Sequence, residues 1–147
     1  VQGFVAGVNA ALKIKGEEPM ILRRMDGYIG TLIDDLVTKG TNEPYRIMTS
    51  RSEYRLLHRQ DNADQRLSPI GHRIGLVPDA QYEAVLEKYR AVEREIKRLE
   101  ATGVAESEAL NAMLTARDTA PVKGSARLSD LLRRPQIGYA DLAPFDP

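Results

Sequence analysis

Arginine side chains gather in and just after the stretch from Asp26 to Asp64. A guanidinium donates two parallel, charge-assisted hydrogen bonds to a phosphate, so clustered arginines are suited to reading an anion. Composition alone favours a different interpretation, a face that is solvated or that forms salt bridges with Glu53, Asp61 and Asp64. The arginines of this cluster are Arg46, Arg51, Arg55, Arg59 and Arg66.

Other polar and aromatic side chains lie between these arginines. Asp34 and Asp35 are adjacent on an expected helix and point about 100 degrees apart, so they cannot form a close carboxylate pair. We expect them to hold an arginine or a backbone amide rather than to do acid–base chemistry. Tyr45 and Tyr54 suit stacking on a nucleobase, and they suit a hydrophobic core equally well.

Several kinds of site are excluded by residue types. The chain has no cysteine, which excludes a disulfide, a thiolate metal site and a cysteine nucleophile within it. His58 and His72 are its only histidines, and neither has acidic neighbours at metal-ligand spacing. His58 beside Leu56 and Leu57 reads as a structural histidine. No GxGxxG or P-loop occurs, so the chain alone cannot build a nucleotide site of those kinds.

Length and charge set further bounds. The 147 residues suffice for one ordinary domain with a modest core, and the formal net charge is zero. A role in nucleic-acid binding must therefore rest on a local patch. No apolar run approaches the roughly 20 residues that span a bilayer, and no secretory signal begins the chain. Because Val1 opens directly into a helical pattern, we interpret the chain as a segment of a larger protein.

The first 60 residues predict two helices and an irregular basic stretch. Residues 1–14 read as a helix whose small side chains, including Gly3 and Gly7, indicate close packing against a sheet, another helix or a ligand. Residues 29–38 show the apolar spacing of an amphipathic helix. Residues 41–50 are expected to be extended or looped, and residues 51–59 to form a short helical turn followed by an extended piece.

The rest of the chain reads as an all-helical bundle. The helix over 79–101 carries an apolar stripe at heptad-like spacing, which predicts either core packing in the bundle or docking of a partner protein. The stripe consists of Tyr82, Val85, Tyr89, Val92, Ile96 and Leu99. The other predicted helices run from Asp61 or Asn62 to about Leu67, from Ser68 and Pro69 to Gly75, over 107–117, and over 125–134 before Pro135.

The order of residues in the arginine-rich stretch resembles a known family. YIGTLIDDLVTKGTNEPYRIMTSRSEYRLLHRQDNAD at 28–64 is similar to the glucose-inhibited division protein A family. This family is the large, flavin-containing subunit of the tRNA uridine 5-carboxymethylaminomethyl modification enzyme. QGFVAGVNAAL at 2–12, GHRIGLV at 71–77 and LLRRPQIGYADL at 131–142 also look like family segments. The resemblance covers essentially the whole chain.

This resemblance implies a mainly α fold made of two parts. Residues 1–60 would be the end of an FAD-binding domain, with its last helix and an arginine-rich linker block. Residues 61–147 would be a helical C-terminal domain, truncated at its end. The dinucleotide fingerprint and the cysteines of the family would lie upstream of this chain.

The resemblance also implies a reaction. The family installs a carboxymethylaminomethyl or aminomethyl group at C5 of the wobble uridine of certain tRNAs. FAD is its cofactor, and NADH and 5,10-methylenetetrahydrofolate are co-substrates. The enzyme works in the cytoplasm as a homodimer bound to a GTPase partner. This chain would contribute tRNA and partner contacts and one edge of the flavin site.

Individual residues take roles from the same resemblance. Gln2 and Gly3 match the start of the helix that contacts FAD. Asp34 and Asp61 are expected to orient cations rather than to do chemistry, and no catalytic or metal-binding residue is assigned. The expected tRNA-binding residues are Arg46, Arg51, Arg55, Arg59, Lys39 and Tyr54.

Two other functions compete with this one. The related folate- and FAD-dependent methyltransferase of the tRNA T-loop uridine shares the FAD-domain end but lacks a helical extension such as residues 79–134. A non-catalytic helical RNA-binding or adaptor module is the alternative of a different class. In isolation the chain is expected to bind no flavin and to be inactive, and a yellow purified sample would contradict this.

Overall fold

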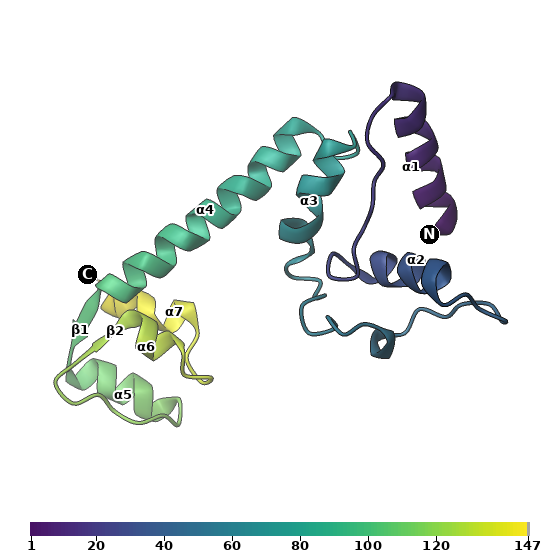
Figure 1. Ribbon diagram of the computed structural model, residues 1–147. Coiled ribbons are helices and arrows are strands. Elements are labelled where there is room, and N and C mark those ends of the chain that lie inside the picture. The colour runs from purple at the N-terminus through teal and green to yellow at the C-terminus, as the bar shows by residue number, and fades with distance from the viewer. Residues whose placement is uncertain (147) are drawn as a thin grey trace. The chain divides into compact units, whose positions relative to one another are not determined.

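The computed structural model describes residues 1–146, which fall into two compact units. The first unit is Val1–Glu87 and the second begins at Lys88. Helices dominate both units, and the only strands among the described residues are two short ones in the second (Figure 1). The predicted mainly α fold is confirmed. The predicted division of the chain at residue 60 refers to the family's domains and stays a prediction.

The first unit contains α1 (Gln2–Lys15), α2 (Tyr28–Thr38), the 3-10 turn η1 (Thr49–Arg51) and α3 (Ala63–Arg73). It ends within α4 (Asp79–Ala101). These bounds agree with the predicted helices over 1–14, 29–38 and 79–101. The segment from residue 41 to 48 has no regular structure, as expected before and after a proline.

An asparagine fixes the chain that leaves α1. Asn9 accepts a hydrogen bond from the Met20 amide at 2.6 Å and donates one to the Met20 carbonyl at 3.1 Å. The side-chain amide of Asn9 thereby satisfies both the N–H and the C=O of Met20, as the backbone of a neighbouring β-strand would. Leu12 and Met20 are both buried beside this contact. A second asparagine, Asn111, makes the same pair of bonds to the amide and carbonyl of Val122, at 2.8 and 3.2 Å.

Helix α2 approaches the preceding backbone through Gly30. A Cβ placed on Gly30 would lie 2.0 Å from the carbonyl oxygen of Arg23. Only a residue without a side chain fits there. The helix α1 glycines behave differently, because a Cβ on Gly3 or Gly7 would meet no heavy atom within 4 Å. The packing partner predicted for that face of α1 is therefore not found in residues 1–146.

Helix α3 corrects a predicted helix boundary. The sequence predicts that a new helix begins at Ser68 and Pro69, yet both lie inside one continuous helix, and Ser68 is buried there. Proline at this position removes a single backbone donor. Ile70 and Gly71, which follow the proline, are partly buried in the first unit. Gly75, at φ 77, follows the helix end as predicted.

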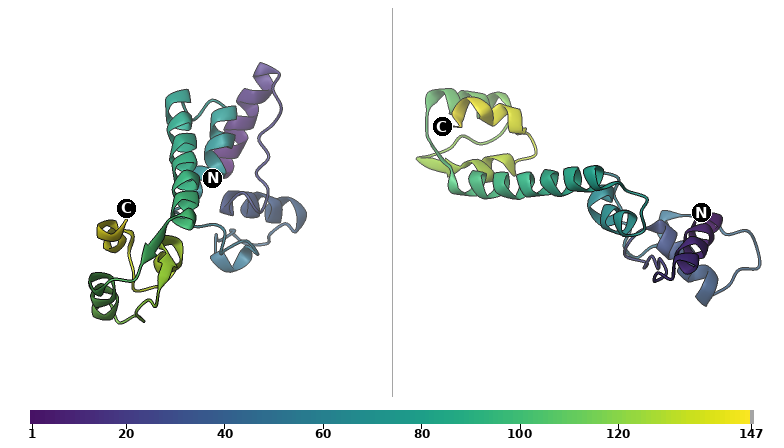
Figure 2. Two further views of the ribbon diagram at one scale, coloured as in Figure 1. Left: turned by 90° about the vertical axis from the view of Figure 1, so that its left-hand side faces the viewer. Right: turned by 90° about the horizontal axis from the view of Figure 1, so that it is seen from above.

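The second unit is built around leucines. Leu110, Leu114, Leu128 and Leu131 are fully buried, and Leu99 from the last turns of α4 joins them. In both views of Figure 2 the green and yellow elements of this unit gather together. These elements are β1 (Gly103–Ala105), α5 (Glu108–Ala116), β2 (Ser125–Arg127), α6 (Leu128–Leu132), α7 (Tyr139–Leu142) and the 3-10 turn η2 (Ala143–Phe145).

The prediction of one helix over 125–134 is wrong in its first part. Residues 125–127 form β2, which pairs antiparallel with β1, and Val104 lies opposite Ala126. Only the following five residues are helical, in α6. Three-residue strands offer too few positions for an alternating pattern to be recognised. The predicted helix over 107–117 is confirmed as α5, and the Ser107 hydroxyl accepts from the Leu110 amide at its start.

The apolar stripe of α4 does not form a bundle core among the described residues. Leu99 alone of the six is buried, and Val92 and Ile96 remain 45% and 50% exposed. The prediction of core packing is confirmed for Leu99 and wrong for Val92 and Ile96, whereas Tyr82, Val85 and Tyr89 are partly buried. Docking of a partner on it stays a prediction. No helix within residues 1–146 combines the length and apolar character needed to cross a membrane.

Candidate nucleic-acid interface

Arg24 is the centre of the polar network in the first unit. Its guanidinium donates to Asp34 at 2.9 Å, to Asp35 at 2.7 Å and to both oxygens of Glu53 at 2.8 and 2.9 Å. It also donates to the backbone carbonyl of Arg51 at 3.0 Å. A planar guanidinium can satisfy several acceptors in a fixed geometry. Arg24 therefore ties α2 to the turn around η1.

Asp35 is the buried acid of this network, with a side chain only 5% exposed. Besides Arg24 it accepts from the Lys39 ammonium at 2.8 Å and from the Tyr45 hydroxyl at 2.6 Å. Hydrogen bonds from Lys39, then Tyr45, hold the pKa of Asp35 well below its ordinary value. Burial, and after it the bond to Asp35, raises the pKa of Tyr45. Asp35 thus stays an acceptor, and Tyr45 a donor, at neutral pH.

Arg51 rests on an aromatic ring. Its Cζ lies 4.5 Å from the centroid of the Tyr45 ring, within the range of a cation–π contact. The guanidinium makes no ion pair with any acid in residues 1–146. Tyr45 is therefore engaged on one ring face by Arg51, and its hydroxyl by Asp35.

Arg46 and Arg55 are exposed, and neither has an ion pair or hydrogen bond to its side chain in the described chain. Together with Arg51 they leave three guanidinium charges uncompensated in one segment. We call residues 46–59 the basic segment. Its charge is not neutralised locally, which is the condition for attracting phosphates.

The other predicted cations are already paired. Arg59 donates to Asp61 at 3.0 Å, with both side chains more than 60% exposed. Lys39 is bound to Asp35. Arg66, the fifth arginine of the cluster, donates to the carbonyls of Asp26 and Arg59 and is structural. Of the predicted salt-bridged face, the pair Arg59–Asp61 is present. The exposure of Arg46, Arg51 and Arg55 agrees with a solvated face as well as with phosphate binding.

The basic segment is not a helix. After η1 it continues through turns, so Arg51, Arg55 and Arg59 do not share a helical face. The expected extended piece is also wrong. The turns are held by His58, which is buried, lies 3.1 Å from the Met25 carbonyl and 3.4 Å from the Ser52 hydroxyl, and packs edge-on against Tyr28. The interpretation of His58 as structural agrees with these contacts.

Exposed apolar side chains alternate with the unpaired arginines of the basic segment. Ile47 and Met48 are about half exposed, and Leu56 is 84% exposed. Tyr54, predicted to contact tRNA, is 38% exposed. Guanidinium groups interleaved with apolar and aromatic surface are typical of contacts with unpaired nucleotides. The tRNA-binding role of Tyr54 stays a prediction.

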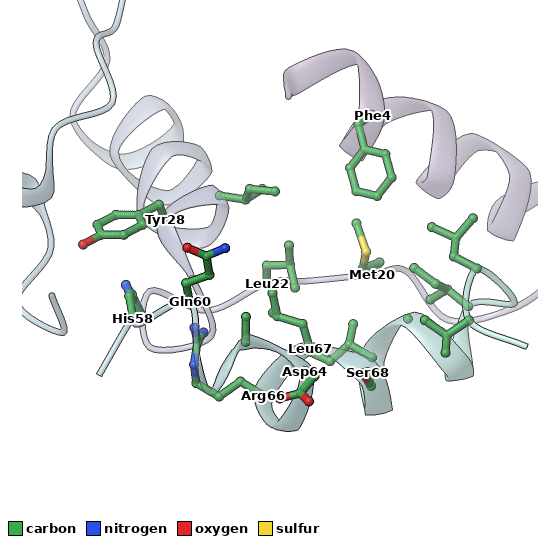
Figure 3. Close-up of a pocket in the computed structure, with 18 of the residues that line it drawn as sticks. Phe4, Met20, Leu22, Tyr28, His58, Gln60, Asp64, Arg66, Leu67 and Ser68 are labelled. Atoms are coloured by element: carbon green, nitrogen blue, oxygen red, sulfur yellow. The ribbon is translucent and has the colours of Figure 1, made fainter. Parts of the chain in front are cut away.

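An apolar pocket of about 780 Å³ lies between α1, α2, α3 and the start of α4 in the first unit. Figure 3 shows Phe4 pointing toward Met20 on one side, while Tyr28, His58 and Gln60 gather at the other. Arg59 of the basic segment lines the polar end. The basic segment therefore borders a hollow of the size that ligands occupy.

Gln2 and Gly3 lie at the open N-terminal end of α1, and both are exposed. Free backbone N–H groups of a first helical turn suit a polar cofactor edge. The open space at Gly3 leaves room for close approach. These residues fit contact with one edge of a flavin nucleotide, and within residues 1–146 no fingerprint for its phosphates accompanies them.

Arg24 is the residue of this network that sequence reasoning missed, because it precedes the arginine-rich stretch that begins at Asp26. Asp34, expected to orient a tRNA-binding cation, instead binds Arg24. Asp61 does orient one of the predicted cations, Arg59. A signal was present, since Arg24 follows another arginine directly before α2, but partners 10 to 29 residues away leave no local pattern.

Arg24→Met is expected to lower the free energy of unfolding of the first unit by about 2 kcal/mol. The loss of stability would be larger if the ion pair were fully buried, but the Arg24 side chain is 22% exposed. Urea unfolding of the chain followed by circular dichroism measures the effect. The matched control is Arg23→Met, where an arginine 68% exposed is removed, and equal effects for the two variants would contradict the hub role of Arg24.

The first unit is expected to lose stability in acid partly through Asp35. Its folded pKa lies below the unfolded value, so its contribution is complete above the unfolded pKa and disappears as pH falls through the folded one. Hydrogen bonds from Arg24, then from its own backbone, also lower the pKa of Glu53 to about 2. Urea midpoints between about pH 6 and pH 2 should fall less steeply for Asp35→Asn than for the unaltered chain. Parallel curves would refute this.

A protein-family model matches the second unit together with the start of α4. Residues 79–147 match the model described as the tRNA modifying enzyme MnmG/GidA C-terminal helical domain. The tRNA uridine 5-carboxymethylaminomethyl modification enzyme MnmG of Caldicellulosiruptor saccharolyticus is 53% identical over 99% of the chain. The enzyme of the same name from Enterococcus faecalis is 54% identical over 99%. The chain spans 23% of the length of each of these relatives.

Solved structures agree with these sequence matches. Aquifex aeolicus GidA in its form II crystal matches 97% of this chain with a TM-score of 0.76 and 40% sequence identity, over 22% of its own length. The form I crystal of the same protein matches 78% of the chain with a TM-score of 0.64 and 49% identity, over 19% of its own length. The fold described above therefore recurs in a solved relative. The chain belongs to the MnmG/GidA family.

Proposed function

We propose that the chain is part of a flavin-dependent enzyme that modifies tRNA at C5 of the wobble uridine, adding a carboxymethylaminomethyl or aminomethyl group. The names of its relatives support the reaction class. Within that enzyme the chain supplies a tRNA-binding surface, formed by the basic segment. The observation that carries this proposal is the set of exposed arginines, Arg46, Arg51 and Arg55, that have no acidic partner in residues 1–146.

The chain's share in cofactor binding is limited to an edge. Bound FAD would supply the redox and one-carbon chemistry, and Gln2 and Gly3 would contact it from the start of α1. The isolated chain is proposed to bind no flavin and to be inactive. NADH, 5,10-methylenetetrahydrofolate, the homodimer, the GTPase partner and the cytoplasmic location belong to the proposal for the whole enzyme. The exposed stripe of α4 is available for partner contacts.

The test is tRNA binding by the full-length enzyme carrying Arg46→Ala and Arg55→Ala. Removing one phosphate contact should reduce the slope of log affinity against log salt by about one unit. We expect the double variant to lose about two units of slope and to bind weakly at low salt. Filter binding of an unmodified tRNA transcript across a salt series measures both.

Arg23→Ala is the matched control, because it removes an exposed arginine that Asp26 already neutralises. Its salt slope should equal that of the unaltered enzyme. If the Arg46 and Arg55 double variant also keeps the unaltered slope and affinity, the basic segment does not bind tRNA phosphates.

A further inference from the structure

Arg51 differs from the other cations of the first unit in what holds it. Arg59 and Lys39 are held by carboxylates, whose negative charge cancels theirs. Arg51 is held by the neutral ring of Tyr45, 4.5 Å from its Cζ. A ring face restrains a guanidinium without neutralising it, and its N–H groups remain able to donate to an anion.

The position of Tyr45 is itself fixed by the buried network. Its hydroxyl donates to Asp35 Oδ2 at 2.6 Å, and Asp35 is locked on α2 by Arg24 and Lys39. The main chain of Arg51 is tied to the same network, because its carbonyl accepts from Arg24. These contacts thus hold both the backbone and the side chain of Arg51 in position relative to α2.

We propose that Tyr45 is a positioning residue, which holds the uncompensated Arg51 guanidinium ready for a backbone phosphate of the bound RNA. This inference rests on the proposed function, since it assumes that the basic segment contacts RNA. It gives Tyr45 a role other than stacking on a nucleobase. Fixing the guanidinium beforehand reduces the side-chain entropy that phosphate binding costs.

The salt dependence of tRNA binding separates this role from a merely structural one. Tyr45→Gln keeps a donor for Asp35 but removes the ring, so Arg51 loses its support. Although no charge is removed, we expect the full-length enzyme to lose about one unit of salt slope, as in Arg51→Ala. The double variant Tyr45→Gln with Arg51→Ala should show no further loss, because both changes remove the same contact.

Two substitutions serve as matched comparisons. Tyr45→Phe keeps the ring that supports Arg51 but loses the hydroxyl bond to Asp35, so it should lose less slope than Tyr45→Gln. Tyr139→Leu removes a tyrosine of the second unit, whose hydroxyl donates to Glu95, and should leave the slope unchanged. Circular dichroism at each salt concentration of the series checks that a variant is folded there, because salt also changes the stability of a charged network. If Tyr45→Gln does not fold, Tyr45→Leu takes its place in the same series.

The outcomes distinguish the two proposals. A loss of slope in Arg51→Ala together with an unaltered slope in Tyr45→Gln overturns the positioning role and leaves RNA binding by the basic segment intact. Unaltered slopes in Arg51→Ala and in the Arg46 and Arg55 double variant overturn the proposed function itself. A loss of slope in Tyr139→Leu equal to that in Tyr45→Gln also overturns the positioning role, because the effect would not depend on the Arg51 contact.

Discussion

Leu131→Ala is expected to lower the free energy of unfolding of the second unit by about 3 to 4 kcal/mol. Leu131 is fully buried in α6 and packs in the leucine cluster with Leu110, Leu114 and Leu128. Removing its side chain forfeits the transfer free energy of buried methylene groups and leaves a cavity. A unit of this size has a free energy of unfolding of only a few kcal/mol, so the second unit of the variant should be largely unfolded near body temperature.

The neighbouring residue supplies the control. Leu132 is only partly buried against the same cluster, and Leu132→Ala should cost roughly 1 kcal/mol. Thermal unfolding and the dispersion of amide signals from residues beyond Lys88 compare the two variants. A cost for Leu132→Ala that equals or exceeds that for Leu131→Ala would show that the core is centred elsewhere.

Gly30→Ala is expected to destabilise the first unit by about 3 kcal/mol or more. The added Cβ would lie 2.0 Å from the Arg23 carbonyl oxygen and 2.6 Å from the Arg23 carbonyl carbon, and these are backbone atoms that cannot rotate away. Either α2 or residues 22–23 must move, which would disturb the Arg24 contacts to Asp34 and Asp35. Urea unfolding measures the effect, and tRNA binding by the full-length enzyme should weaken with it.

Gly7→Ala is the matched control, a glycine-to-alanine change in another helix. No atom lies within 4 Å of the new Cβ, and alanine is the better helix former, so the change should stabilise α1 by up to about 1 kcal/mol. The opposite signs of the two effects are the result to look for. A destabilisation by Gly7→Ala in the full-length enzyme, but not in this chain, would reveal a packing partner outside residues 1–146.

Sequence reasoning locates the long helices well and the short elements poorly. The bounds of the helix over 79–101 agree with the prediction, because a helix of 23 residues repeats its apolar spacing over several turns. The sequence of β2 reads as helix, since three residues cannot display a period. Pro69 led to the wrong prediction of a helix start, because proline is common at the first position of a helix. In the structure it lies inside α3.

Only the basic segment of the candidate site could be predicted from the sequence. The basic segment is visible from composition and order, and the exposure of Arg46 and Arg55 agrees with it. The network of Arg24 and Tyr45 around Asp35 is not visible in the sequence, because its hydrogen bonds to Asp34 and Asp35 join residues ten or eleven apart. Glycines show the same limit: Gly3 and Gly7 stand out in a small-residue pattern, whereas Gly30, which has backbone against it, does not.

The paired bonds of Asn9 and Asn111 constrain where the chain can change length. Each asparagine makes hydrogen bonds to a backbone amide and carbonyl 11 residues later. These bonds hold together the two ends of the segment between them, which contains the end of a helix and the following loop. An insertion in residues 10–19 or 112–121 would separate both pairs of atoms at once and leave polar groups without partners. Residues 40–43 are exposed and carry no such closure. A peptide tag or a reporter graft therefore belongs at that tip, where added length costs only loop entropy.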